Sequence, residues 1–212
     1  MRAEFLIVFR RAASLSWSDD RGSLLLMELD HGSRRYFNLA LVGFMGVGKS
    51  SVARLIGSQL HFPVVDTDDL IEQRAGGMKI NELFARYGET GFRARERDVV
   101  ESLHELRRTV ISTGGGLVTD PENLASLKRH SLVVCLWASP DVIWERVRHQ
   151  SNRPLLQTKD PRERIRELVI QREPFYREAD VMVNSEHRHL HEVASNVLHQ
   201  ARLACGGEFP SC

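Results

Sequence analysis

Short apolar runs alternate with helix-like segments along most of the chain. About five runs have the length of a buried strand: residues 38–42, 62–65, 109–112, 132–137 and 181–183. Between them, apolar residues recur every three or four positions, which is the spacing of one face of a helix. Strands that alternate with helices build a mostly parallel sheet that helices cover on both faces. The pattern therefore predicts a three-layer α/β fold with a central parallel sheet of roughly five strands.

Three dipeptides mark places where helices should begin. Asp120-Pro121, Ser139-Pro140 and Asp160-Pro161 each place a capping residue before a proline. Side chains of Asp and Ser accept hydrogen bonds from the first backbone N–H groups of a helix, and proline suits its first position. We therefore expect a helix to begin at each of these prolines.

A glycine-rich stretch between the first apolar run and the first helix, Gly43 to Ser50, has the spacing G-x-x-x-x-G-K-S. A strand before this pattern and a helix after it are the context that a phosphate-binding P-loop requires. Its backbone N–H groups and the helix N-terminus attract an anion. The lysine reaches the β- and γ-phosphates, and the serine hydroxyl can bind Mg²⁺. A chance glycine-rich turn would not need the flanking strand and helix. The expected nucleotide-binding residues here are Gly46, Val47, Gly48, Lys49, Ser50 and Ser51.

Two carboxylates follow the second apolar run. Asp66 and Asp68 are separated by one residue. Phosphoryl transfer needs Mg²⁺ near the phosphates and a group that orients the attacking hydroxyl, and one carboxylate can serve each purpose. Either residue also suits the N-cap of a helix, and that alternative stays open here. Ligands of parallel sheets bind at the carboxyl ends of the strands, so both carboxylates should share one edge with the P-loop.

The third strand runs into three consecutive glycines, Gly114, Gly115 and Gly116. Such a run is costly to order and offers no side chains. It favours a place where the backbone approaches a ligand closely, although a flexible turn is the alternative.

A polar connection at residues 151–159 contains Arg153. The helix before it should end near His149 and the next should begin at Pro161. Residues 148–160 are therefore a candidate lid, and an arginine in such a loop can neutralise charge during phosphoryl transfer.

Composition narrows the class of protein. The net charge is +1, and no apolar run approaches the ~20 residues that cross a bilayer, so we expect neither a nucleic acid nor a membrane as partner. The three cysteines show no metal-ligand spacing, which favours reduced thiols in the cytoplasm.

Several motifs occur in the order and approximate spacing of the shikimate kinase family. They are Gly43-Phe-Met-Gly-Val-Gly-Lys-Ser50, Asp66-Thr-Asp68, Gly91-Phe92-Arg93, Gly114-Gly-Gly116, Arg153-Pro-Leu-Leu156 and Arg172-Glu-Pro-Phe-Tyr176. The P-loop alone indicates only a nucleotide, whereas the combination is specific. The chain resembles this family from about residue 38 to its last helix. Ser51 stands where threonine is common, which is a mild departure.

The resemblance implies a P-loop fold like that of the nucleoside monophosphate kinases and transfer of phosphate from ATP to shikimate. It implies Mg²⁺ held by Ser50 and Asp66. Catalysis would rest on Asp68, Lys49 and Arg153. The site residues that it implies for shikimate are Asp68, Arg93, Gly114, Gly115, Gly116 and Arg172, and Arg146, Arg153 and Arg188 would lie near the nucleotide. The protein would act as a cytoplasmic monomer in aromatic amino-acid synthesis.

The family leaves the first residues unexplained. Residues 1–36 contain two apolar patches around a turn-like cluster, and a hairpin, a mobile arm or a transit peptide are all open. Met27 could also be the true start. We divide the chain into an N-terminal extension, residues 1–36, and a P-loop kinase domain, residues 37–212.

Other functions share part of these features. A gluconate kinase would have the P-loop and the sheet, but gives no evident reason for two arginines beside a triple glycine. A nucleoside monophosphate kinase differs in its phosphate acceptor. A non-catalytic nucleotide-binding module would be expected to lack one of Lys49, Ser50, Asp68 or Arg153, and all four are present.

Overall fold

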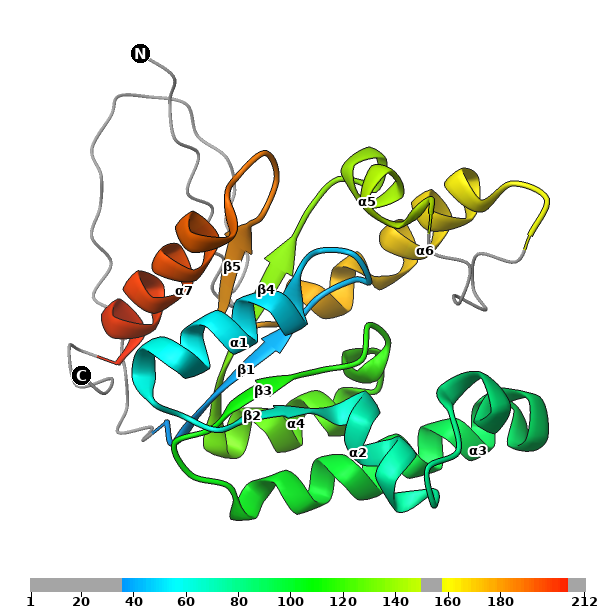
Figure 1. Cartoon of the computed structure of the whole chain (residues 1–212), viewed down its shortest axis with the longest axis horizontal. Coiled ribbons are helices and arrows are strands. Elements are labelled where there is room, and N and C mark those ends of the chain that lie inside the picture. The colour runs from blue at the N-terminus through cyan, green and yellow to red at the C-terminus, as the bar shows by residue number, and fades with distance from the viewer. Residues whose placement is uncertain (1–35, 150–157, 206–212) are drawn as a thin grey trace, which may run out of the picture.

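A computed structural model describes residues 36–149 and 158–205 of the chain. Its sheet has five strands, all parallel, in the order β2-β3-β1-β4-β5 (Figure 1). The strands are β1 (Asn38–Val42), β2 (Val64–Asp66), β3 (Val110–Ser112), β4 (Ser131–Trp137) and β5 (Val181–Asn184). The predicted three-layer α/β fold is confirmed.

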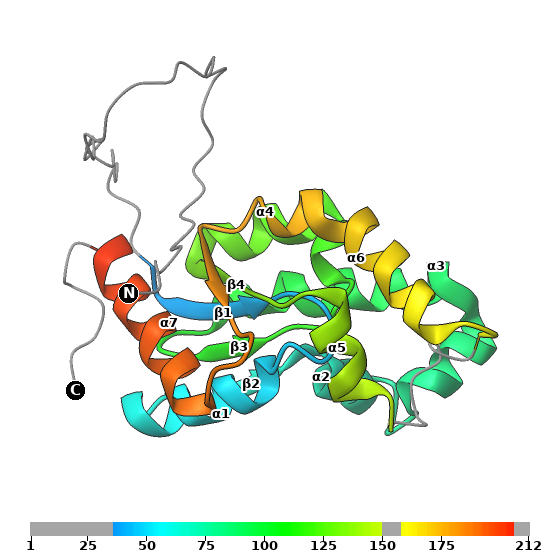
Figure 2. The same cartoon turned by 90° about the horizontal axis from the view of Figure 1, so that it is seen from above.

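Helices cover both faces of this sheet. They are α1 (Lys49–Leu60), α2 (Thr67–Arg74), α3 (Ile80–Ser102), α4 (Pro121–His130), α5 (Pro140–Val147), α6 (Pro161–Tyr176) and α7 (Leu190–Ala204), with short 3₁₀ helices η1 (Leu103–Glu105) and η2 (Leu117–Thr119). α1 and α7 pack together on one face, whereas α4 lies on the other and contacts α3 (Figure 2). α5 packs against α6, and α2 packs against α3.

The three helices expected to follow a capping residue and a proline begin at those prolines. Asp120 accepts a hydrogen bond from the Glu122 N–H at 3.0 Å, and Asp160 accepts one from the Glu163 N–H at 3.0 Å. Each bond satisfies one of the backbone donors that a helix start leaves open. Ser139 makes no such side-chain bond, so the proline after it fixes that start by its restricted φ.

The hydrophobic core explains why the central strands read as continuous apolar runs. All five residues of β1 are buried, and six of the seven in β4 are. Both strands lie between neighbours and between two helical layers, so neither of their faces meets water. A smaller apolar cluster joins α2 to α3 and consists of Ile71, Leu83, Phe92 and Val99.

Two boundaries differ from expectation. The second strand is shorter and later than the apolar run 62–65, because it lies at the edge of the sheet and pairs only with β3. A glycine disfavours a helix, so propensity alone would end a helix at Gly88, yet α3 continues past it. Gly88 has φ 67° and ψ −176°, so one residue leaves the helical conformation and the helix resumes after it.

Every strand runs in the same direction, so the carboxyl ends of all five strands lie at the same end of the sheet. We call this end of the sheet the rim. In the part of the chain that the structure describes, no helix is long and apolar enough to cross a membrane. Residues 1–35, and residues 150–157 of the expected lid, lie outside the described residues, so the domain boundary and the lid stay predictions.

Candidate active site

The phosphate loop connects the end of β1 to the start of α1. Gly43, Gly46 and Gly48 have φ angles of 131°, 77° and 101°, a region that side chains rarely adopt. A Cβ atom at Gly43 would lie 2.2 Å from the Leu136 carbonyl oxygen, so β4 leaves no room for one. The glycines therefore permit both the turn and its close packing on the sheet. Val47 is buried, which leaves its backbone rather than its side chain to face a nucleotide, and Ser51 is exposed on α1.

Lys49 is buried at the first position of α1 and its ammonium group lies over the phosphate loop. Its Nζ donates to the carbonyl oxygens of Gly43 at 2.8 Å and Phe44 at 2.9 Å. The loop therefore holds a positive charge beside the N-terminus of α1, whose own partial charge has the same sign. Both features favour a phosphate group at this position.

A set of oxygen atoms lies beside the first turn of α1. The Ser50 hydroxyl donates to Asp66 Oδ2 at 3.0 Å and lies 3.2 Å from the Ser112 hydroxyl oxygen. Carboxylate and hydroxyl oxygens are the ligands that Mg²⁺ takes, and this cation usually keeps several waters as well. Ser50 and Asp66, predicted from the sequence, are thus brought together in an arrangement that fits the ion.

Asp66 has a second contact. Its Oδ1 accepts the Asp68 N–H at 3.1 Å and so caps α2. The cap is therefore confirmed, and because it uses only Oδ1, the predicted role of Asp66 toward Mg²⁺ is compatible with it and stays a prediction. Asp68 lies in the first turn of α2 and faces the triple glycine, because a Cβ at Gly114 would lie only 2.6 Å from Asp68 Oδ1.

The triple glycine turn lies between the phosphate loop, α2 and α3. The Gly114 N–H donates to the Thr67 hydroxyl at 2.9 Å. A Cβ at Gly115 would lie 3.1 Å from the Met45 nitrogen, and one at Gly116 would lie 2.9 Å from both terminal nitrogens of Arg93. The turn is therefore an ordered backbone surface that neighbouring groups approach closely.

Two arginines from distant parts of the chain border this turn. Arg93 lies in α3 against Gly116, and Arg172 in α6 donates from Nη1 to the Gly115 carbonyl at 3.3 Å. The family resemblance assigned both to the shikimate site, and the fold places them on the same short turn although they are far apart in sequence.

A buried glutamate that the sequence analysis missed joins these groups. Glu96 is 1% exposed and forms an ion pair with Arg93. Burial raises the pKa of the Glu96 carboxyl; Arg93 and Arg172 oppose this shift, whereas the negative charge of Asp68 adds to it. Its sequence signal was a charged residue on the apolar side of α3, four positions from Phe92.

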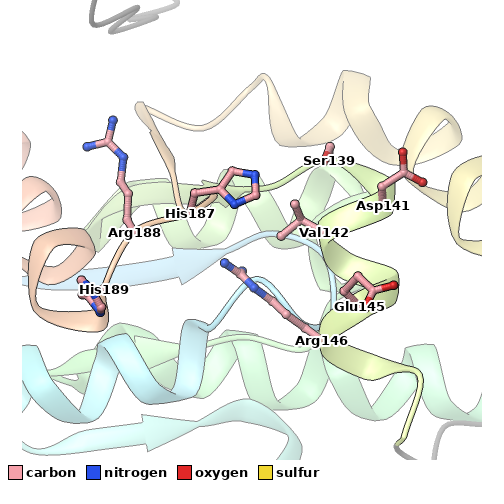
Figure 3. A pocket seen from close by; sticks show the side chains of 8 residues that line it. All are labelled: Ser139, Asp141, Val142, Glu145, Arg146, His187, Arg188 and His189. Carbon is pink, nitrogen blue, oxygen red and sulfur yellow. The ribbon is translucent and has the colours of Figure 1, made fainter. Parts of the chain in front are cut away.

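An open pocket of about 630 Å³ lies between α5 and the connection from β5 to α7 (Figure 3). Arg146 fixes one wall, since it donates to the Ser185 carbonyl at 2.6 Å, the Ser185 hydroxyl at 3.2 Å and the Gly46 carbonyl at 3.3 Å. The pocket thus borders the phosphate loop. Its lining residues are Ser139, Asp141, Val142, Glu145, Arg146, His187, Arg188 and His189.

Two other arginines, Arg188 and Arg153, were predicted to lie near the nucleotide. Arg188 is exposed, and Figure 3 shows its guanidinium directed away from that of Arg146. Arg153 lies outside the described residues. The structure therefore brings Arg146, rather than Arg188, into contact with the phosphate loop.

Comparisons with known proteins agree with this arrangement. The family model "Shikimate kinase" matches residues 45–202. Shikimate kinases of Thermodesulfovibrio yellowstonii and Nitrosospira multiformis are both 42% identical, over 81% and 79% of this chain and 98% and 86% of their own lengths. The solved shikimate kinase of Acinetobacter baumannii, in complex with shikimate, is 32% identical with a TM-score of 0.75 and covers 84% of this chain and 97% of its own. The chain therefore belongs to the shikimate kinase family.

Proposed function

We propose that this protein transfers the γ-phosphate of ATP to the 3-hydroxyl of shikimate, giving shikimate 3-phosphate and ADP. The observation that carries this proposal is the rim, where a phosphate loop, the carboxylate of Asp68 and two guanidinium groups border one triple glycine turn. This arrangement provides for an anionic phosphate donor on one side and an acceptor with a hydroxyl and a carboxylate on the other.

The nucleotide binds along the phosphate loop, with its base in the pocket beside Arg146. Lys49 and the N-terminus of α1 hold the phosphates, and Gly46, Val47 and Gly48 contribute backbone N–H groups. Ser50 and Asp66 would hold Mg²⁺, Asp66 through water, and the ion would supply positive charge beside the phosphates. Arg188 contributes positive charge near the nucleotide.

The acceptor lies between α2, α3 and the triple glycine turn. Arg93 and Arg172 bind its carboxylate, because a guanidinium offers two parallel N–H donors to two oxygens. The glycines let the sugar-like ring approach the backbone. Asp68 accepts the hydrogen of the attacking hydroxyl and orients the oxygen toward the phosphorus atom.

Charge must be balanced while phosphate moves between the two substrates. Lys49 lies on the nucleotide side, and Arg153, assigned from the sequence motif alone, would reach the phosphates from the predicted lid. A lid would also exclude water, so that ATP is not spent on hydrolysis.

The test is ADP release coupled to a spectrophotometric readout, with shikimate, gluconate and nucleoside monophosphates as acceptors. We expect ADP release to be stimulated strongly by shikimate alone. Stimulation by gluconate or by a nucleoside monophosphate instead would identify another kinase, and nucleotide binding without turnover of any acceptor would indicate a non-catalytic module. Light scattering after gel filtration tests the accompanying proposal that the protein is a monomer.

A further inference from the structure

The carbonyl oxygen of Gly115 accepts two hydrogen bonds from α6. The Tyr176 hydroxyl donates at 2.6 Å and Arg172 Nη1 donates at 3.3 Å. The two donors are four positions apart and so lie on one face of the helix. A carbonyl oxygen has two lone pairs, and these two groups use both. The Tyr176 bond is the shorter, so this hydroxyl makes the larger contribution to holding the carbonyl.

Tyr176 is buried inside the site. Its side chain is 3% exposed, and burial raises the pKa of its hydroxyl well above the ordinary value. The hydroxyl therefore remains a protonated donor over the whole physiological range. Its partner is a backbone carbonyl of the triple glycine turn, which no side chain of that turn can help to orient.

The geometry of the peptide unit transmits this contact to the turn. A trans peptide is planar, so its C=O and its N–H point in opposite directions. Because the Gly115 carbonyl is directed at α6, the N–H of Gly116 is directed away from α6. Within the described residues, no hydrogen bond uses the N–H of Gly115 or of Gly116. The contact with α6 therefore orients the Gly116 N–H, and no hydrogen bond within the described part of the protein uses that donor.

The hydrogen bond from Tyr176 also affects the position of Arg172. Its guanidinium lies 5.6 Å from the centre of the Phe44 ring and touches the same carbonyl as Tyr176. With the carbonyl already satisfied by Tyr176, Arg172 keeps only a long bond to it. Without that hydroxyl, Arg172 would be the single remaining partner of the Gly115 carbonyl and would be drawn toward it.

We propose that Tyr176 is a positioning residue for the acceptor substrate: its hydroxyl fixes the peptide between Gly115 and Gly116 and, through the shared carbonyl, the guanidinium of Arg172. This inference rests on the proposed function, in which both groups hold shikimate. It predicts that loss of the hydroxyl affects binding of the acceptor and leaves ATP binding unchanged, because among the described residues no hydrogen bond joins the phosphate loop to this hydroxyl or to this carbonyl.

The test is steady-state kinetics of Tyr176→Phe in the full-length protein. We expect the KM for shikimate to rise about three- to tenfold, the range for one lost hydrogen bond, with kcat and the KM for ATP within about twofold of wild type. An unchanged KM for shikimate would overturn the inference, as would a general loss in which kcat and both KM values change together.

Ser131→Ala is the matched control for stability. It removes another buried hydroxyl, at the opposite end of β4, whose oxygen lies 2.9 Å from His130 Nδ1. We expect this variant to lower the melting temperature without changing the KM for shikimate. If Ser131→Ala raises that KM as much as Tyr176→Phe does, the effect follows from stability and the inference is wrong. A Tyr176→Phe protein that fails to fold would contradict it too, since the hydroxyl would then determine the fold.

The methyl ester of shikimate gives a second readout, because it lacks the charge that Arg172 would bind. We expect Tyr176→Phe to weaken use of the acid more than use of the ester. If Tyr176→Phe weakens use of the acid and of the ester equally, the hydroxyl does not act through Arg172, and the inference is contradicted. The two proposals also fail separately. A wild-type protein that does not phosphorylate shikimate rejects the proposed function, whereas an active wild type with an unaffected Tyr176→Phe variant rejects only the role of Tyr176.

Discussion

Asp66 illustrates how one residue can have two structural roles at the rim. Its Oδ1 caps α2, and its Oδ2 accepts from the Ser50 hydroxyl. The capping bond fixes the carboxylate in orientation, so the second oxygen is held toward the first turn of α1. The alternatives that the sequence left open, a cap or a ligand of Mg²⁺, are therefore compatible with each other.

In the proposed function, the neighbouring carboxylate of Asp68 orients the attacking hydroxyl. We expect Asp68→Asn to lower kcat by about a hundredfold or more, because an amide cannot accept the proton of the attacking hydroxyl. The amide is nearly the same shape, so the close approach to Gly114 is kept. Kinetics with shikimate, circular dichroism and ATP binding by calorimetry would check this. Near-normal turnover in this variant would rule out the assigned role.

Arg93 should contribute to acceptor binding through its geometry as well as its charge. Arg93→Lys keeps the charge but loses the paired donors, so we expect shikimate affinity to fall by about 1–3 kcal/mol, the range for a charged hydrogen bond, with ATP affinity unchanged. Isothermal calorimetry with each substrate measures both.

A second arginine of the same helix is the control for Arg93. Arg95 donates to the Gly91 carbonyl at 2.7 Å and lies over the Tyr87 ring, so it supports α3 without bordering the triple glycine turn. Arg95→Lys should leave shikimate affinity unchanged. A loss as large as that of Arg93→Lys would mean that both residues act on α3 rather than on the carboxylate.

At the scale of elements, local patterns predicted most of the fold. The proline starts of α4, α5 and α6 were readable because cap and proline act on a few adjacent residues. The bounds of β2 were not, since they depend on which residues of β3 lie opposite. The continuation of α3 past Gly88 also escaped prediction, because packing against α2 restores the helix that a single glycine interrupts.

The cap of α4 gives a test at this scale. Asp120→Ala removes the acceptor of the Glu122 N–H and should lower the free energy of unfolding by about 0.5–2 kcal/mol. The ion pair of Asp120 with Arg97 is long, at 3.7 Å, and partly exposed, so it adds little. Asp120→Asn keeps a capping side chain without the charge and should retain most of the stability. Urea denaturation distinguishes the two, and equal losses would assign the effect to charge.

For the whole molecule, the candidate site could be predicted only in parts. Each motif at the rim was visible locally, and the parallel sheet explained why the strand ends should meet. The contact of Arg93 and Arg172 with one turn required the folded chain, because the two lie on different helices. Glu96 was missed because a charged residue on a buried helix face has no motif of its own. Tyr176 ends the motif Arg172–Tyr176 but was assigned no role, because its contact with Gly115 forms only in the folded chain.

The end of the sheet opposite the rim contains a buried histidine. His130 is the last residue of α4 and is 5% exposed. Its Nδ1 lies 2.9 Å from the Ser131 hydroxyl oxygen and 3.3 Å from the Asn38 side-chain nitrogen. Among the described residues its Nε2 is buried without a hydrogen-bond partner. Because an amide nitrogen can only donate, Nδ1 is suited to be an acceptor, which requires a neutral ring.

This histidine should make the stability of the molecule sensitive to acid. Burial lowers the pKa of His130 from 6.5 to about 4, and the positive charges of Arg107, His104 and Arg129 add to the effect. The unfolded chain therefore binds a proton at this residue below about pH 6.5, whereas the folded chain does so only near pH 4. Stability is complete above pH 6.5 and falls between pH 6.5 and 4, by at most about 3 kcal/mol from this group.

Urea denaturation at several pH values tests this expectation, and the slope of stability against pH is the quantity to compare. His130→Gln removes the titrating ring and keeps an amide that can bond to Ser131, so the variant should be less stable at pH 7 and yet lose less stability on acidification than wild type. His199, exposed on α7, supplies the matched control, and His199→Gln should retain the wild-type slope. Because other groups titrate in the same range, the difference between the two slopes is decisive. Identical slopes for the two variants would show that His130 does not couple folding to pH, and that the acid sensitivity of the molecule originates elsewhere.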